Sequence, residues 1–236
     1  MGERMENTIE SRFNPEIVNE LEKTPFLIDE DKMILLLTLI GEKPAATFYS
    51  RLDFGSTVED EKKFLDESDF LSKWLEKSGL VFSIEEKIIK SEEGKPISKI
   101  VTFNIARDKA ALDRLDEADK GNNKKEIGLA LGYPATAVEA FSKNDVKDRD
   151  DLPFDLNGSE VSDFLFFRLS KEHWAEEFET VKRWQMAIKD NFPDFYKRFT
   201  DMRPKIDSLE KMAAMKQRDE KLYQELLQEK QNIEKR

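Results

Sequence analysis

Two stretches of alternating apolar and polar residues, separated by a turn, constrain the fold of this chain more than any other feature. Apolar side chains occupy the even positions of residues 82–88 except Glu86, and the odd positions of residues 97–105 except Lys99. This period of two is typical of strands with one buried face. Residues 91–96 between them contain a glycine and a proline, which favour a turn. The sequence therefore predicts a β-hairpin over residues 80–106.

Helical spacing of apolar residues precedes and follows the predicted hairpin. We expect helices over residues 15–23, where Pro15 suits the first helical position, and over residues 59–78, where Gly79 provides the stop. A further helix is expected over residues 109–118. The apolar side of the helix over 59–78 contains Phe64, Leu71, Trp74 and Leu75.

The longest apolar stretch, Met33 to Ile40, is far shorter than the roughly 20 residues of a membrane-spanning helix. Its periodicity leaves helix and strand open, but Asp29 as an N-cap favours a helix. The segment Gly41–Pro44 ends it. The polar N-terminus and Glu6, where myristoylation needs Ser or Thr, indicate neither a signal peptide nor a lipid anchor, so we expect a cytoplasmic protein.

Residues 123–141 predict two helices that meet at a sharp turn. Asn123 suits the cap of the first helix, and Gly132 suits the left-handed position after it. The spacing of Gly128, Gly132 and Val138 is that of a helix-turn-helix, because such helices cross closely at a small side chain. We therefore expect a tight helical corner here.

The sequence beyond the polar connection at residues 142–151 predicts a third strand and further helices. The aromatic run within Val161–Leu169 indicates a strand buried on both faces. Ser170 is expected to cap a helix that places His173 at its third position and continues to about Asp190. Phe192-Pro193 interrupts this helix. Beyond Pro204 the sequence contains neither Gly nor Pro up to residue 236, which predicts a long helix from Pro204.

These elements predict an α+β fold that is predominantly helical, with a β-hairpin and an additional strand packed with helices, and a long C-terminal helix. We expect an N-terminal α+β lobe over residues 1–120 that contains the hairpin. A helical lobe over residues 121–200 would hold the corner and the aromatic strand, and a helical tail would follow over residues 201–236.

Composition narrows the classes of function. The chain has no cysteine and one histidine, and it lacks the glycine-rich phosphate-binding motifs and the serine-hydrolase motif. Thiol nucleophiles, disulfides and thiolate metal sites are thereby excluded. The acidic clusters lack the spacing of a calcium-binding loop. The sequence therefore indicates no metal site and leaves any cofactor unknown.

A small set of polar residues at the ends of apolar segments could bind an anionic ligand. Strand ends and helix starts are where clefts form, and arginine commonly binds carboxylates and phosphates. The alternative is that each cation pairs with one of the many acidic residues on the surface. The candidates for such a site are Lys43, Arg107, Tyr133, Arg168 and His173.

The predicted corner offers a DNA-binding alternative through Thr136, Ser142 and Lys143. The second helix of the corner has few side chains that read base edges. The net charge of −11 also disfavours phosphate contacts and an anionic membrane. The simpler interpretation of the pattern is a packed structural corner.

The same corner carries a family resemblance. Gly132-Tyr133-Pro134 followed by Val138 and Phe141 resembles a Gly-Tyr-Pro-x-Cys-Cys-Val-x-x-Phe segment of uncharacterised archaeal and bacterial domains of unknown function. Thr136 and Ala137 replace the two cysteines of that segment, so the resemblance implies no thiol chemistry here.

A chain with so few reactive side chains is expected to act by binding. We therefore expect a non-enzymatic binding or regulatory protein that acts through a protein or small-ligand surface. Two alternatives stay open. One is a DNA-binding regulator that uses residues 123–141, and the other is an enzyme or carrier for a small anionic ligand. The sequence identifies neither the partner nor the ligand.

Overall fold

The computed structural model of this chain describes residues 14–147, 152 and 159–201. The chain divides into two compact units, residues 1–192 and residues 193–236. The first unit contains the sheet and most of the described helices. In the second unit, residues 193–201 are helical.

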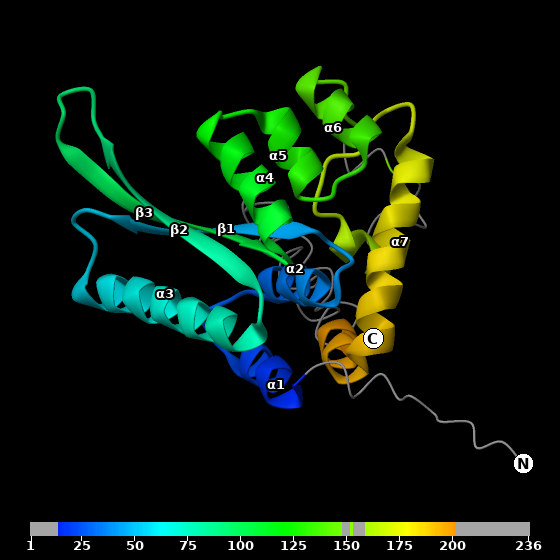
Figure 1. Ribbon diagram of the computed structural model, residues 1–236, viewed down its shortest axis with the longest axis horizontal. Coiled ribbons are helices and arrows are strands. Elements are labelled where there is room, and N and C mark those ends of the chain that lie inside the picture. The colour runs from blue at the N-terminus through cyan, green and yellow to red at the C-terminus, as the bar shows by residue number, and fades with distance from the viewer. Residues whose placement is uncertain (1–13, 148–151, 153–158, 202–236) are drawn as a thin grey trace, which may run out of the picture. The chain divides into compact units, whose positions relative to one another are not determined.

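The first unit is built on a three-stranded antiparallel sheet in the order β1-β3-β2 (Figure 1). The predicted hairpin is confirmed, because β2 and β3 pair across the turn at residues 91–95. In the central strand, Phe103 lies opposite Phe48 of β1 and Ile84 of β2. The strands are β1 (Ala45–Asp53), β2 (Val81–Lys90) and β3 (Pro96–Ala106).

The predominantly helical α+β class is confirmed, but the additional strand lies elsewhere than predicted. It is β1, whereas residues 161–169 form no strand. They continue a short 3-10 helix, η3 (Glu160–Phe164), and then an irregular segment that ends in a single bridge between Ser170 and Val146. The prediction was wrong because an aromatic run can be covered by helices as well as by a sheet, and of these rings only that of Phe164 is fully buried.

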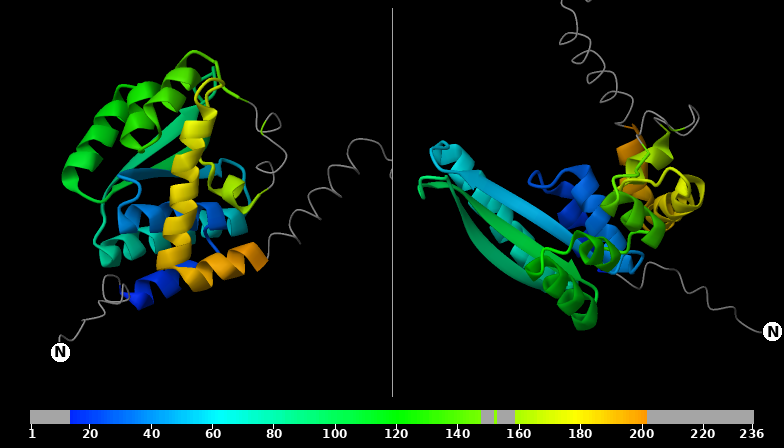
Figure 2. Two further views of the ribbon diagram at one scale, coloured as in Figure 1. Left: turned by 90° about the vertical axis from the view of Figure 1, so that its right-hand side faces the viewer. Right: turned by 90° about the horizontal axis from the view of Figure 1, so that it is seen from above.

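Helices cover both faces of the sheet, with α3 on one face and α4 on the other (Figures 1 and 2). Helix α1 packs against α3, where the Trp74 indole nitrogen donates to the Ile17 carbonyl at 2.9 Å. Helix α7 packs against α2 and η3. The bounds of these helices are α1 (Pro15–Lys23), α2 (Asp29–Ile40), α3 (Val58–Ser78), α4 (Lys109–Lys120) and α7 (Trp174–Asn191).

Most of these helices begin and end close to where the sequence predicts. Met33–Ile40 is helical, but Ile28 occupies the N-cap of α2 and Asp29 is the first helical residue without a side-chain cap bond. Gly79 ends α3 in the left-handed conformation with φ 76°, as predicted. Phe192 interrupts the helical run after α7. No helix of the described ranges combines the length and apolar character needed to cross a membrane.

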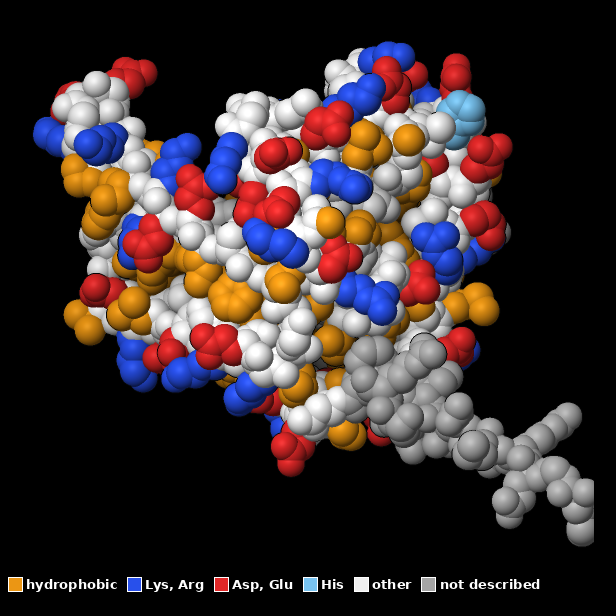
Figure 3. Space-filling view, in the orientation of Figure 1, with side chains coloured by type: hydrophobic (Ala, Val, Ile, Leu, Met, Phe, Trp, Pro, Cys, Tyr) orange, Lys and Arg blue, Asp and Glu red, His pale blue; other side chains and the backbone are white. Residues whose placement is uncertain are grey.

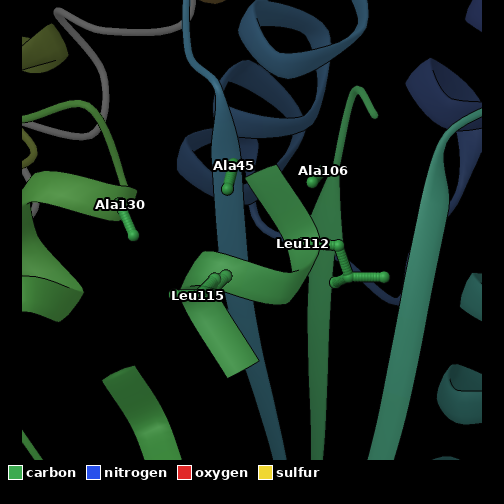
Figure 4. Packing of buried hydrophobic residues seen from close by; sticks show 5 residues of the cluster. All are labelled: Ala45, Ala106, Leu112, Leu115 and Ala130. Atoms are coloured by element: carbon green, nitrogen blue, oxygen red, sulfur yellow. The ribbon is translucent and has the colours of Figure 1, made fainter. Parts of the chain in front are cut away.

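A small apolar cluster joins the sheet to α4 and to the next helix, α5 (Lys124–Ala130). Ala45 and Ala106 are neighbours on β1 and β3, and their small side chains let Leu112 and Leu115 of α4 approach closely (Figure 4). Ala130, at the end of α5, completes the cluster. The sheet thereby fixes the position of α5, which is the first helix of the predicted corner.

Candidate functional site

The two predicted helices of the corner are present as α5 and α6 (Ala135–Ser142). A Cβ placed on Gly128 would lie 2.8 Å from a methyl group of Val138, so the helices cross at a distance that only glycine permits. Asn123 caps α5 by accepting from the Glu126 amide at 3.3 Å. The spacing identified in the sequence therefore arises from close helix packing.

Gly132 fixes the turn between these helices against the loop that leads into β1. Its φ of +78° lies in the left-handed region. A Cβ on Gly132 would lie 2.4 Å from Cδ of Pro44. The corner and the end of β1 are therefore locked together at these two residues.

Lys43, next to Pro44, is the most unusual residue of this region because its side chain is only 1 % exposed. Its Nζ donates to the Leu131 carbonyl at 2.8 Å and lies 4.3 Å and 4.5 Å from the ring centroids of Tyr133 and Trp184. No carboxylate of the described residues is within ion-pair distance. Burial lowers the pKa of Lys43 to about 7.

The rings around Lys43 belong to a larger aromatic cluster. Tyr133 and Phe167 lie 5.4 Å apart, and Phe166 stacks on Trp184 of α7 at 5.7 Å with an interplanar angle of 24°. Phe167 meets Trp184 edge to face at 5.8 Å. Burial raises the pKa of Tyr133 to about 12, so its hydroxyl stays protonated near neutral pH. The irregular segment after η3 thus has its aromatic side chains held by α7 and the corner.

An apolar cavity of about 320 Å³ lies between the corner and this segment. Its walls come from α5, α6 and residues 166–168, and Phe141 at its edge is half exposed. Lys124 and Arg168 are the only charged residues among the described residues of the lining. These residues are Lys124, Ile127, Gly128, Leu131, Tyr133, Ala137, Val138, Phe141, Phe166, Phe167 and Arg168.

A second cavity of about 430 Å³ shares residues 166–168 with the first. Its lining is more polar and includes Glu30, Lys147 and Leu152. Leu152 is flanked on both sides by residues outside the described ranges. The first cavity is therefore the better-defined candidate site.

The structure brings together three of the five residues predicted for a ligand site. Lys43 contacts Tyr133, and Tyr133 and Arg168 line the same cavity. Arg107 lies instead beside Gly41, where a Cβ would meet its guanidinium. His173 is the N-cap of α7, rather than its third residue, and its half-exposed ring is 3.9 Å from the Glu176 carboxylate. Neither Arg107 nor His173 lines either cavity.

Several residues of the site were not singled out from the sequence as site residues. Trp184 continues the spacing of Val181 and Ile188 on the buried side of α7, which was the available signal. Lys124 is the first residue of α5 and carries no distinctive motif. Phe141 was visible only as part of the corner pattern.

The residues predicted for DNA binding are exposed on and after α6, but their charge is largely compensated. Lys143 lies 3.1 Å from the Glu139 carboxylate, which Lys125 also contacts. Thr136 and Ser142 are uncharged. Figure 3 shows lysine and arginine interspersed with acidic residues on the face that carries these helices. This arrangement gives no concentrated positive surface there.

No protein-family model, curated protein sequence or solved structure matches this chain. Its function is therefore inferred from the geometry of the site, and the resemblance at residues 132–141 stays a prediction.

Proposed function

We propose that this protein is a non-enzymatic, cytoplasmic binding protein that holds a small molecule in the apolar cavity between the α5–α6 corner and residues 166–168. The observation that carries this proposal is the cavity itself. Its volume of about 320 Å³ is at the lower end of the range of roughly 300–1,000 Å³ found for small-molecule sites.

The walls of this cavity are fixed by close packing, which favours binding. Gly128 and Val138 join α5 to α6, Gly132 and Pro44 join the turn to β1, and Phe166 stacks on Trp184. A preformed apolar site loses little conformational entropy when a ligand enters. The site therefore suits recognition without rearrangement.

The lining offers little to a chemical reaction. Its described residues include no carboxylate and no imidazole, and the raised pKa of Tyr133 keeps its hydroxyl protonated. Lys124 and Arg168 can bind an anion, but the part of the lining that the structure describes offers no general base. These features support binding over catalysis.

The proposal is tested by filling the cavity with a larger side chain. Ile127 is partly buried and lines the cavity, so Ile127→Trp should occupy the space that a ligand needs. With the uncharged probe 2-naphthamide, we expect the dissociation constant measured by calorimetry to rise at least about tenfold. Thermal unfolding monitors whether the variant is folded.

The matched control is Met186→Trp, which adds the same ring at a position 60 % exposed on α7 and outside the cavity. This control should bind the probe as the wild type does. Equal binding by folded Ile127→Trp and the wild type would contradict the proposed site, as would a wild type that does not bind the probe.

A further inference from the structure

The lining of the cavity has a charge that is opposite to that of the chain. The sequence contains 50 acidic and 39 basic residues, yet among the described residues the lining contains Lys124 and Arg168 and no acidic residue. Both side chains are exposed, so their charges act most strongly at low ionic strength. The charges of the described lining are therefore positive, although the protein as a whole is acidic.

Lys124 is the cation best placed to meet a ligand. Its side chain is exposed at the start of α5, and it forms no ion pair with any carboxylate of the described residues. The neighbouring Lys125, in contrast, is paired with Glu139, which also contacts Lys143. Glu139 on α6 is thus already paired with Lys125 and Lys143, which are not among the residues of the lining.

The aromatic walls favour a flat ligand body. Tyr133, Phe141, Phe166 and Phe167 all line the cavity. Three of these rings are held by aromatic neighbours, since Tyr133 contacts Phe167 and Phe166 stacks on Trp184. Aromatic rings pack well against the faces and edges of other rings. The small volume limits the body to about two fused rings.

From these observations we infer that the ligand is a small planar aromatic anion, such as an aromatic carboxylate, whose negative group pairs with Lys124 while its rings lie among the aromatic walls. Arg168 adds to the positive potential of the same cavity. The inference rests on the proposed function, which it extends from a small molecule to a chemical class.

The experiment compares two probes of nearly the same shape that differ in charge, 2-naphthoate and 2-naphthamide. Calorimetry at low ionic strength should show that the wild type binds the carboxylate about tenfold more tightly than the amide, because only the carboxylate forms an ion pair with Lys124, whereas the amide carbonyl accepts at most a hydrogen bond. Lys124→Ala should remove most of this difference and change the affinity for the amide far less.

The control variant is Lys120→Ala, which removes the same charge from an exposed position on α4 outside the cavity lining. It should keep the preference for the carboxylate. Equal affinity of the wild type for both probes would overturn the charge inference and leave the proposed function intact. If both variants lost this preference equally, the preference would depend on the overall charge of the protein, and the role of Lys124 would be overturned. Binding of neither probe would overturn the inference and the proposed function together.

Discussion

Replacing Gly132 with alanine is expected to lower the free energy of unfolding by about 3 kcal/mol or more. Two costs add at this position. An alanine in the left-handed region is disfavoured by roughly 1–2 kcal/mol, and the new Cβ would lie 2.4 Å from Cδ of Pro44. The proline ring is part of the backbone and cannot rotate away, so the corner and the start of β1 must move apart.

Urea unfolding followed by circular dichroism measures this loss. Gly79→Ala is the matched control, because Gly79 has nearly the same φ, +76°, and nothing lies within 4 Å of a Cβ there. The control carries only the conformational cost. Equal destabilisation by both substitutions would contradict the tight contact between the turn and Pro44.

The second large effect is a rise of stability with pH that depends on Lys43. In the unfolded chain Lys43 holds its proton up to its ordinary pKa of 10.5, whereas burial lowers the folded pKa to about 7. Between these values the unfolded state binds more protons, so the free energy of unfolding rises with pH. From pH 7 to pH 9.5 we expect a gain of about 3 kcal/mol.

Lys43→Met should remove this gain, because methionine has a similar length and no charge. Lys120→Met, at an exposed position, should keep it. Tyr133 acts in the opposite direction only above pH 10, since its folded pKa of about 12 exceeds the unfolded value of 10. Chemical unfolding is therefore measured between pH 7 and pH 9.5. The same slope in the wild type and Lys43→Met would contradict a buried, uncompensated amine.

The parts of the fold that follow from local patterns were predictable. The hairpin of β2 and β3 follows from a period of two around a turn, and the corner from the spacing of Gly128, Gly132 and Val138. In each case the residues that carry the pattern also make the contacts. Local sequence is then sufficient, because side-chain alternation and glycine conformation depend on near neighbours.

The strand positions that depend on distant partners were not predictable. Strand β1 is defined by its pairing with residues of β3 that lie 45 to 61 positions later, and its small residues Ala45 and Ala46 give no strand signal by themselves. The prediction of a strand in the aromatic run before Arg168 was wrong for the same reason. Its rings contact Trp184 and Tyr133, which are distant in sequence, where neighbouring strands were expected.

The candidate site shows the same division. Lys43, Tyr133 and Arg168 were identified from their positions at the ends of apolar segments, where chain turns bring side chains together. Lys124 and Trp184 were not, because only the packing of α5 and α7 around the cavity gives them a role. Sequence patterns locate such residues along the chain, whereas the distances between them depend on the whole fold.

The most direct test of the central claim is to locate a bound aromatic probe by intermolecular nuclear Overhauser effects to labelled methyl groups. With 2-naphthoate, we expect contacts from the probe to the methyl groups of Ile127, Ala137 and Val138, which line the cavity. Contacts confined to the exposed Ile84 and Ile88 of the hairpin would place the probe on the outer sheet surface and would contradict a ligand site at the corner.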